Sequence, residues 1–456
     1  MSTTIKRRFR LSTAHWIMLS FLAMILLGSL LLALPISSAN GVSVGYIDAL
    51  FTATTATCVT GLVTLPTFST WSIFGQAVIL LLIQVGGLGV ITVLSGLMIA
   101  LHRRMSLGNR LLIQDAFNLN TLSGLGAFIK KVLLGTLLIE GIGALCYMIV
   151  FIPEFGAKGI WISVFTSISA FCNAGIDVIA PDSLCGYVHN PLVNAVTCVL
   201  IILGGIGYIV WWDVLRVLKD APRKSFRCLR HLTLHSKLAI TTTLVLIFGG
   251  ALSIFIFEYD NPLTMKDFTL AQKIGASLFQ SVTTRTAGFM TLPQQNLSNA
   301  SAVLCLLLMF IGGSPVGTAG GIKTVTALVL LACAVSTIRG KNDVTLFHRN
   351  VSRQALRKAL AVSCMSFIIL SISTLLLCAI THHASALDIL YETVSATATV
   401  GLSRNLTPTL STAGKLIITA TMYLGRVGPI SLAIAFNTKK ESPNIIKNPT
   451  EEISVG

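Results

Sequence analysis

Long apolar runs alternate with short polar segments along the whole chain. The runs fall at about 14–35, 73–101, 127–152, 191–215, 238–257, 301–337, 359–380 and 412–436. A helix needs about 20 apolar residues to cross a bilayer, which is close to the length of most of these runs. A β-barrel would instead show alternating segments of about 10 residues, which are absent here. The pattern predicts an all-α polytopic membrane protein, in which the run 301–337 is too long for one helix and is interrupted by glycines.

Basic residues gather in alternate segments between the apolar runs. These segments are 6–10, 102–110, 216–237, 339–358 and 439–440, whereas 36–72, 153–190, 258–300 and 382–411 carry few basic residues. Cytoplasmic segments of membrane proteins are enriched in Lys and Arg, so both termini are expected in the cytoplasm. The first run is longer than the core of a signal peptide, and we expect it to be retained as the first helix.

Composition supports the membrane class and argues against others. Hydrophobic residues make up 54% of the 456 residues and charged residues 11%, whereas charged residues are about a quarter of a soluble domain. The net charge of +16 follows from the basic cytoplasmic segments, so no nucleic-acid partner is expected. The ten cysteines have no metal-type spacing and no nucleophile–base set is evident, so an enzyme is not expected. Whether Cys172 and Cys185 pair is left open.

Each segment poor in basic residues contains a stretch that ends in glycine. The stretches are TCVTG at 57–61, FCNAG at 171–175, TRTAG at 284–288 and TATVG at 397–401. Their terminal glycines lie 114, 113 and 113 residues apart. A constant period of this kind indicates internal repeats. We predict four repeats at 1–110, 111–230, 231–350 and 351–440, followed by a cytoplasmic tail at 441–456.

Other positions keep the same period. Ten residues before each glycine stands a bulky apolar residue, namely Phe51, Phe165, Leu278 and Tyr391. The following run of each repeat carries a glycine motif: GGLG at 86–89, GGIG at 204–207, GGSPVG at 312–317 and GRVG at 425–428. Each repeat is therefore expected to be a helix, a short re-entrant helix, a glycine turn and a second helix, all in one orientation. A duplicated bundle without a pore, with small residues used for helix packing, is the alternative.

The glycine turns suit the coordination of a monovalent cation. Irregular backbone at membrane depth is tolerated where it is buried or lines a wet cavity. Four turns around one axis would form a ring of carbonyl oxygens, which can replace the hydration shell of K⁺ or Na⁺. A pore selective for divalent cations would be expected to carry rings of carboxylates, and no aligned Asp or Glu occurs at the turns.

The stretch TATVG resembles the start of the potassium-channel selectivity filter, and four degenerate copies in one chain resemble the Trk/Ktr/HKT superfamily of potassium transporters. The resemblance covers nearly the whole chain. It implies that the filter consists of Val59, Thr60, Gly61, Asn173, Ala174, Gly175, Thr286, Ala287, Gly288, Thr399, Val400 and Gly401. It places K⁺ at the four glycines, and glycine at all four positions favours K⁺ over Na⁺.

The segment IGGSPVGTAGGIK at 311–323 is not expected to be helical. Five of the ten residues from 312 to 321 are glycine and one is proline, at costs of roughly 1 and 3 kcal/mol per helical site. An intramembrane loop is favoured over an extramembrane loop, because the run 301–311 is too short to span. The family has a mobile gate at the matching position, which here corresponds to Gly312, Gly313, Ser314, Pro315, Gly317, Thr318, Gly320 and Gly321.

Charged residues within the apolar runs are further candidates. Arg426 would cost roughly 2.5–3.5 kcal/mol at a helix centre, so it is expected to face the interior. The family carries an arginine here, below the filter, where it would limit cation flux. Glu140 either binds a cation or forms a structural hydrogen bond with a neighbouring helix, and both alternatives stay open. Asp115 and Asp213 lie near cytoplasmic helix ends and are expected to serve packing or capping.

The short N-terminal region makes the chain most like the bacterial Ktr membrane subunit. That resemblance implies a homodimer in the bacterial inner membrane, in contact with lipid. It also implies a cytosolic ring of nucleotide-binding regulatory subunits and stimulation by Na⁺, as in symport. The chain itself has no GxGxxG or GxxxxGK[ST] motif, so no nucleotide is expected to bind it.

Two other functions are alternatives to a gated potassium pore. The first is a Na⁺-permeable or alternating-access cation transporter. Alternating access is typical of inverted repeats with matching broken helices, whereas these repeats share one direction and only the third has an evident break. The second is a membrane scaffold, which leaves the four glycine turns unexplained.

Overall fold

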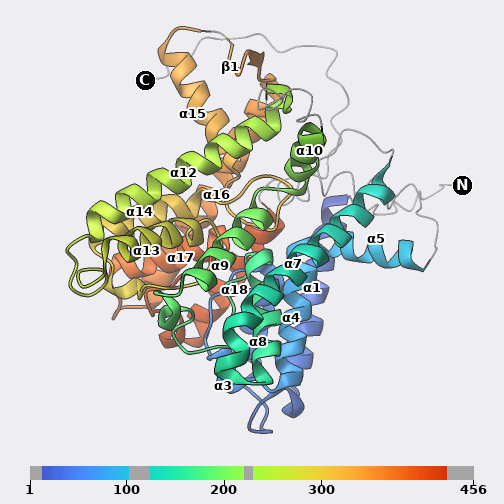
Figure 1. The fold of residues 1–456 in the computed structure, drawn as a ribbon, viewed down its shortest axis with the longest axis vertical. Coiled ribbons are helices and arrows are strands. Elements are labelled where there is room, and N and C mark those ends of the chain that lie inside the picture. Colours follow the sequence, from blue (N-terminus) through green and yellow to red (C-terminus); the bar gives the residue numbers. More distant parts are fainter. Residues whose placement is uncertain (1–12, 102–123, 220–229, 342, 429–456) are drawn as a thin grey trace, which may run out of the picture.

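The computed structural model describes residues 13–101, 124–219, 230–341 and 343–428. Asp115, the basic segments at 6–10, 102–110 and 439–440, and the tail 441–456 lie outside the described residues. The described part is mostly helical, which confirms the predicted all-α class. Figure 1 gives the arrangement of the helices.

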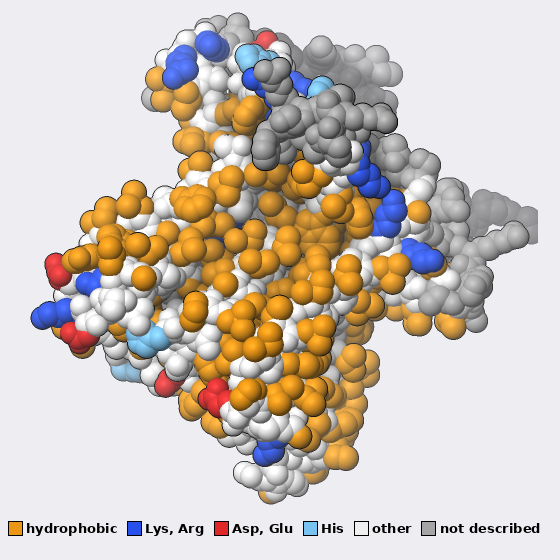
Figure 2. Space-filling model, in the orientation of Figure 1, with side chains coloured by type: hydrophobic (Ala, Val, Ile, Leu, Met, Phe, Trp, Pro, Cys, Tyr) orange, Lys and Arg blue, Asp and Glu red, His pale blue; other side chains and the backbone are white. Residues whose placement is uncertain are grey.

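Four long apolar helices form the outside of the bundle. They are α1 (Thr13–Leu32), α7 (Leu125–Phe155), α12 (Leu234–Glu258) and α16 (Arg353–Ile380), and each contains a window apolar and long enough to cross a membrane. Their outward faces carry exposed Leu, Ile and Phe side chains, such as Leu138, Phe248 and Leu375. Figure 2 shows hydrophobic side chains spread over the body of the molecule. Proteins in water rarely expose apolar patches of this extent, so this surface is expected to face lipid.

Four short helices lie inside this layer. They are α2 (Tyr46–Cys58), α8 (Lys158–Cys172), α13 (Leu270–Thr283) and α17 (Ala386–Ala398). Their second halves are buried, although they are rich in Ser and Thr. Several hydroxyls donate to the carbonyl four residues earlier, as in Thr54 to Leu50, Ser163 to Gly159, Ser277 to Lys273 and Thr393 to Ile389. These bonds satisfy part of the buried hydroxyls within the helix itself, which lowers the cost of burying such polar helices.

The helices that follow the short helices are interrupted, which corrects the sequence interpretation. The apolar run 73–101 forms α4 (Ile73–Leu88) and α5 (Val90–Ala100), with a bend of 94° between them. The run 191–215 forms α9 (Pro191–Gly205) and α10 (Tyr208–Lys219), bent by 99°. The expectation that only the third repeat is broken was therefore wrong. The breaks fall at Gly89 and Gly207, whose φ angles of 87° and 94° are incompatible with a helix.

The helices that follow the third and fourth short helices belong to the second half of the chain. The run 301–337 divides into α14 (Asn299–Phe310) and α15 (Thr324–Ile338), with a non-helical loop between them. Helix α18 (Thr412–Val427) ends at Gly428, where φ is 87°. Gly428 thus has the conformation of Gly89 and Gly207, at the corresponding position of its glycine motif.

The short helices pack in a closed cyclic order. Each contacts the long helix before it, as α2 contacts α1 and α8 contacts α7. Each also contacts a helix of the neighbouring quarter of the chain: α2 packs on α18, α8 on α4, α13 on α9, and α17 on α14. The contact of α2 with α18 joins the first quarter to the fourth, so the four quarters surround one axis.

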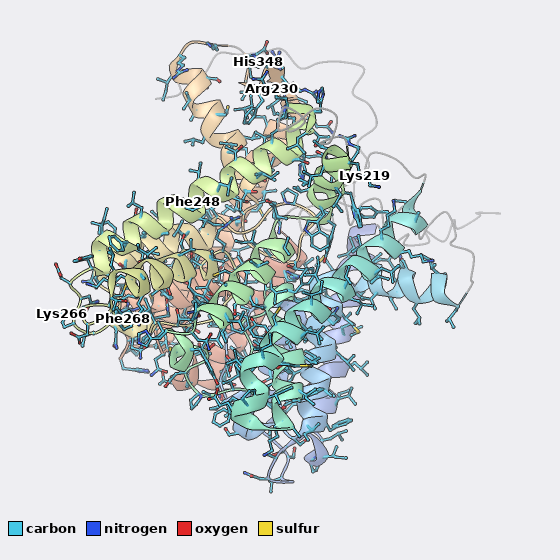
Figure 3. The ribbon with its side chains drawn as sticks, in the orientation of Figure 1. Lys219, Arg230, Phe248, Lys266, Phe268 and His348 are labelled. Carbon is cyan, nitrogen blue, oxygen red and sulfur yellow. The ribbon has the colours of Figure 1, made fainter. Side chains whose placement is uncertain are left out.

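Smaller elements lie at the two ends of the bundle. They include α3 (Thr67–Thr70), the short 3₁₀ helices at Pro35–Ser37, Cys185–Tyr187, Gln294–Asn296 and Thr407–Thr409, and a hairpin of β1 (Thr345–Leu346) and β2 (Arg349–Asn350). The strands are antiparallel, with Thr345 opposite Asn350 and Leu346 opposite Arg349. In Figure 3, Lys219, Arg230 and His348 lie at one end, whereas Lys266 and Phe268 lie far from them.

Candidate functional site

Each short helix ends in a turn with unusual backbone geometry. The residue at the end of the helix or just beyond it is left-handed: Val59 (φ 56°), Asn173 (60°), Thr286 (66°) and Thr399 (51°). Two residues later comes a glycine with positive φ: Gly61 (95°), Gly175 (65°), Gly288 (80°) and Gly401 (97°). We call residues 59–61, 173–175, 286–288 and 399–401 the first to fourth glycine turns. All twelve residues are buried.

The glycine turns close by backbone hydrogen bonds, and the third differs from the others. In the first, second and fourth turns the middle residue donates to a carbonyl five residues back: Thr60 to Thr55, Ala174 to Ser169 and Val400 to Ser395, each at 2.8 Å. This bond belongs to a common helix-ending motif with a left-handed residue. In the third turn Ala287 donates to Thr283, only four residues back, at 2.9 Å.

The four glycines meet at close range around the axis. A Cβ atom built on each glycine would lie closer than 3.0 Å to a carbonyl oxygen of the next turn, a distance that real side chains essentially never show. The pairs, glycine first and carbonyl second, are Gly61 with Ala174, Gly175 with Ala287, Gly288 with Val400 and Gly401 with Thr60. Each carbonyl belongs to the residue just before a glycine, so the structure brings all four predicted turns together in one ring.

Hydroxyl groups behind the ring hold the turns, and the sequence interpretation missed them. Gly61 N donates to Thr55 Oγ1 at 2.9 Å, and Gly401 N donates to Ser395 Oγ at 3.0 Å. Ser169 Oγ receives the N–H of Ile176 at 3.1 Å, and Thr283 Oγ1 donates to the carbonyl of Phe289 at 2.6 Å. The available signal was a Ser or Thr six residues before the glycine in three quarters and five before it in the other.

The ring offers neutral oxygen ligands. No group of three or more His, Cys, Asp or Glu that could hold a metal ion occurs within the part of the chain that the structure describes. Asp177, two residues beyond Gly175, is the acidic group nearest the ring in sequence. Burial raises its pKa from 3.8 to about 6, and hydrogen bonds from Ser183 and the backbone lower the pKa by less than burial raises it. Backbone carbonyls without carboxylates suit a monovalent cation.

The two ends of the 311–323 loop are joined to each other by backbone hydrogen bonds. Gly312 N donates to the carbonyl of Ile322 at 3.0 Å, and Ile322 N donates to that of Phe310 at 3.1 Å. Its far part reaches the break of the second quarter, where Ser314 N bonds Gly205 O at 2.8 Å. The loop therefore lies inside the bundle between α14 and α15 rather than outside it.

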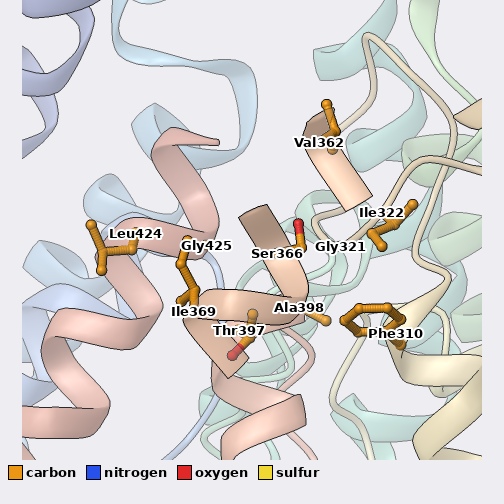
Figure 4. Close-up of a pocket in the computed structure, with 10 residues that line it drawn as sticks. All are labelled: Phe310, Gly321, Ile322, Val362, Ser366, Ile369, Thr397, Ala398, Leu424 and Gly425. Carbon is orange, nitrogen blue, oxygen red and sulfur yellow. The ribbon is translucent and has the colours of Figure 1, made fainter. Parts of the chain in front are cut away.

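The loop also lies against the glycine turns. Gly320 N donates to Thr286 Oγ1 at 3.1 Å. Thr318 Oγ1 donates to the carbonyl of Phe171, close to the end of α8, at 3.1 Å. A small cavity of about 30 Å³ flanks the loop at Gly321 and Ile322, between α14, α16, α17 and α18 (Figure 4).

Three basic side chains bind the loop through its carbonyl oxygens. Arg426 donates to the carbonyl of Thr318 and to that of Gly86, both at 2.6 Å. Lys323 Nζ donates to the carbonyl of Ala319 at 2.6 Å, and buried Arg285 donates to that of Gly312 at 3.2 Å. Arg426 thus faces the interior, as its position in the last run predicted. Lys323 and Arg285 were not predicted from the sequence, although each is a basic residue in an otherwise uncharged stretch.

Glu140 is buried on α7, away from the loop. Its carboxylate accepts a hydrogen bond from Gln84 Nε2 of α4 at 3.1 Å, and the Cys172 thiol lies 3.9 Å away. Ser167 of α8 donates to the backbone carbonyl of Glu140 at 2.6 Å. The geometry is that of a bond between neighbouring helices, which is one of the two alternatives considered for this residue.

Two other candidates have structural surroundings. Asp213 accepts hydrogen bonds from the backbone and hydroxyl of Thr233, the N-terminal cap of α12, at 2.9 and 2.8 Å. It therefore joins α10 to the start of α12. Cys172 and Cys185 are free thiols and do not form a disulfide.

The fold and the ring define a class, an all-α membrane protein whose four quarters surround a set of glycine turns. The family described as TrkH, a cation transport protein, matches residues 3–448, and the chain belongs to this family. Its members are cation transporters, and the chain is therefore a transporter rather than an enzyme.

Individual relatives cover almost the entire chain. Ktr system potassium uptake protein B of Bacillus subtilis is 42% identical over 439 residues, covering 96% of this chain and 95% of the relative. Potassium/sodium uptake protein NtpJ of Enterococcus hirae is 38% identical over 461 residues and covers 100% of both chains. The potassium transporter TrkH of Vibrio parahaemolyticus has the same fold, with a TM-score of 0.74, 15% identity, and coverage of 95% of this chain and 86% of that chain.

Proposed function

We propose that this protein is the ion-translocating subunit of a potassium uptake system. The cyclic close approach of the four glycines is the observation that carries the proposal. The relatives described as potassium uptake proteins support the choice of ion. K⁺ would pass along the axis through the carbonyl oxygens of the four glycine turns.

In this proposal the twelve residues of the glycine turns form the selectivity filter. Moving an ammonium-sized cation into a medium of low dielectric costs on the order of 20 kcal/mol in the idealised estimate. Rings of carbonyl oxygens offset this cost by replacing water ligands. The left-handed residues orient successive carbonyls, and glycine allows the four backbones to approach each other. K⁺ would bind at Gly61, Gly175, Gly288 and Gly401.

The 311–323 loop would be the gate. It lies against two of the glycine turns and contains few bulky side chains, so it can block the path and move aside. Arg426 would strengthen the closed state, since its guanidinium bonds the carbonyl of Thr318 and places a positive charge next to the path. We propose that Glu140 holds α4 and α7 together behind the second turn rather than binding the transported ion.

The proposed assembly is the one that the family resemblance implies. We propose four repeats at 1–110, 111–230, 231–350 and 351–440, with both termini and the tail 441–456 on the cytoplasmic side of the bacterial inner membrane. The protein would be a homodimer, regulated by a cytosolic ring of nucleotide-binding subunits. The relatives whose names place them in a Ktr system support only a further component of the uptake system. Na⁺ would stimulate uptake. The hairpin of β1 and β2 lies at the end of the bundle proposed to face the cytoplasm.

A Na⁺-permeable transporter is the second candidate. The relative described as a potassium/sodium uptake protein covers the full length of this chain, which favours this alternative specifically. Uptake of ²²Na⁺ in the absence of K⁺ separates the two candidates. A Na⁺ rate close to the K⁺ rate would support the second.

Growth of a bacterium that lacks its own potassium uptake systems, at limiting K⁺, tests the main proposal. We expect the wild-type chain, expressed with its regulatory subunit, to restore growth. Gly288→Ser should fail or require far more K⁺, because a Cβ at Gly288 would lie 2.6 Å from the carbonyl oxygen of Val400. Equal rescue by wild type and Gly288→Ser would refute the assignment of the filter.

A further inference from the structure

The third quarter of the ring is supported differently from the other three. In the first, second and fourth quarters, the first glycine of the GGLG, GGIG or GRVG motif packs against a carbonyl at or near the end of a short helix. A Cβ atom there would clash with that oxygen; the pairs are Gly86 with Thr57, Gly204 with Phe171, and Gly425 with Thr397. Each following helix therefore supports its own glycine turn directly.

In the third quarter this direct contact is replaced by the 311–323 loop. Gly312 occupies the matching place, but the nearest atom to a Cβ there would be the carbonyl oxygen of Gly320, a loop residue, and the Thr286 methyl group of the third turn would follow at 3.0 Å. The third turn is also the one closed by the shorter backbone hydrogen bond, from Ala287 to Thr283. The loop thus lies between the third glycine turn and the helix that would otherwise support it.

The loop makes specific contacts with three of the four quarters. Gly320 N donates to Thr286 Oγ1 in the third turn at 3.1 Å, and Thr318 Oγ1 donates to Phe171 O in the second quarter at 3.1 Å. Gly320 also fits against Thr399 of the fourth turn so closely that no Cβ could be added. Breaking these contacts would leave polar atoms of buried turns without partners, at a cost of about 1–3 kcal/mol each.

We propose that the 311–323 loop is a structural part of the filter, so that the position of the gate and the ion selectivity of the filter are coupled. This inference rests on the proposed filter and gate. A closed loop would hold the third turn in its narrow geometry, and a displaced loop would release it. Since coupling between two sites is reciprocal, K⁺ in the filter would in turn favour the closed loop.

Variants on the loop side distinguish coupling from an independent gate. Arg426 contacts the loop through Thr318 O and lies outside the four turns, so Arg426→Ala would displace the loop without altering the filter sequence. In proteoliposomes we expect K⁺ flux to rise and the K⁺/Na⁺ flux ratio to fall by about five-fold or more. A rise in flux with an unchanged ratio would overturn the inference while leaving the gate itself intact. An absence of K⁺ flux in the wild type would instead overturn the proposed function.

A double-mutant cycle tests the contact that transmits the coupling. Thr286→Val removes the acceptor for Gly320 N and should lower the K⁺/Na⁺ ratio by itself. Combined with Arg426→Ala it should add little, because both changes release the same contact. Strictly additive changes in the logarithm of the ratio would contradict the mechanism. Thr337→Val is the control, since this hydroxyl bonds only within exposed α15, and it should change neither flux nor ratio.

Hydrogen exchange of the loop amides gives a readout that does not depend on flux. In the wild-type protein, K⁺ should slow exchange within 311–323 about five-fold or more relative to choline. Thr286→Val should lose this dependence while remaining folded, as judged by unchanged exchange in α7. A loop that exchanges at the same rate in K⁺ and choline would overturn the inference.

Discussion

The guanidinium of Arg426 is bonded at 2.6 Å to the carbonyl oxygen of Thr318, and so joins α18 to the loop that interrupts the third quarter. Its second bond, also 2.6 Å, goes to the carbonyl of Gly86, within the last turn of α4 before the break of the first quarter. One side chain therefore connects three quarters of the chain beneath the glycine turns. Its removal affects both the charge near the axis and the fixation of the loop.

Replacing Arg426 by alanine should raise the maximum rate of ⁸⁶Rb⁺ uptake. Loss of the positive charge and of the bond to Thr318 should lower the barrier to cations, and a reduction of about 1 kcal/mol corresponds to about a five-fold faster rate. Arg426→Lys keeps the charge but cannot form both bonds with a planar fork, so an intermediate rate is expected. An uptake rate equal to that of the wild type in Arg426→Ala would remove the barrier role.

Alanine at Gly401 should weaken selective K⁺ uptake. Its Cβ would clash with the carbonyl of Thr60 and with the Cα of Gly61, and φ is 97°. Overpacking of this kind costs about 1–3 kcal/mol, so K⁺ affinity should fall by about ten-fold or more. Gly141→Ala is the matched control, because a Cβ there meets nothing within 4 Å. The prediction fails if both variants take up K⁺ with wild-type affinity.

Thr55→Val should weaken selectivity although Thr55 lies behind the first turn. The buried N–H of Gly61 would lose its acceptor, at a cost of about 1–3 kcal/mol. Thr57→Val removes a buried hydroxyl of the same helix that has no hydrogen-bond partner among the described residues, so it should have a smaller effect. K⁺/Na⁺ competition in uptake assays measures both. Equal effects would indicate that helix packing, and not the bond to Gly61, determines selectivity.

Asp177 should make the protein less stable as the pH rises from about 4 to about 6. Burial raises its pKa from 3.8 to about 6, so the folded state binds more protons than the unfolded state in this window. Asp177→Asn should therefore melt at a higher temperature than the wild type at neutral pH. The two melting temperatures should converge only at a pH well below 3.8, where the carboxyl is protonated in both states. A wild type more stable than Asp177→Asn at pH 7 would contradict this assignment.

The positions of the glycine turns could be predicted from the sequence because each requires a glycine and the period of 113–114 residues repeats the requirement. The long helices α1, α7, α12 and α16 could be predicted because their apolar runs have the length of a membrane span. The fold class and the presence of four short helices before the glycines followed from the same two signals.

The bends and the contacts between quarters could not be predicted in the same way. The runs 73–101 and 191–215 stay apolar through Gly89 and Gly207, so hydropathy gives no sign of the sharp change in direction. The glycine motifs GGLG and GGIG were used only as a sign of the repeat, although each ends in the glycine at which the helix breaks. The bonds of Arg285 and Lys323 to loop carbonyls depend on tertiary geometry, which residue spacing does not encode.

The ring is assembled from four unlike quarters of one polypeptide, and this has a genetic consequence. In a channel built from four identical subunits, any substitution in the subunit appears at all four corners at once. Here a change in one codon alters only one of the four glycine turns. An obstruction such as the 311–323 loop can thus arise in one quarter alone, and a change in ion preference can evolve by small, independent steps.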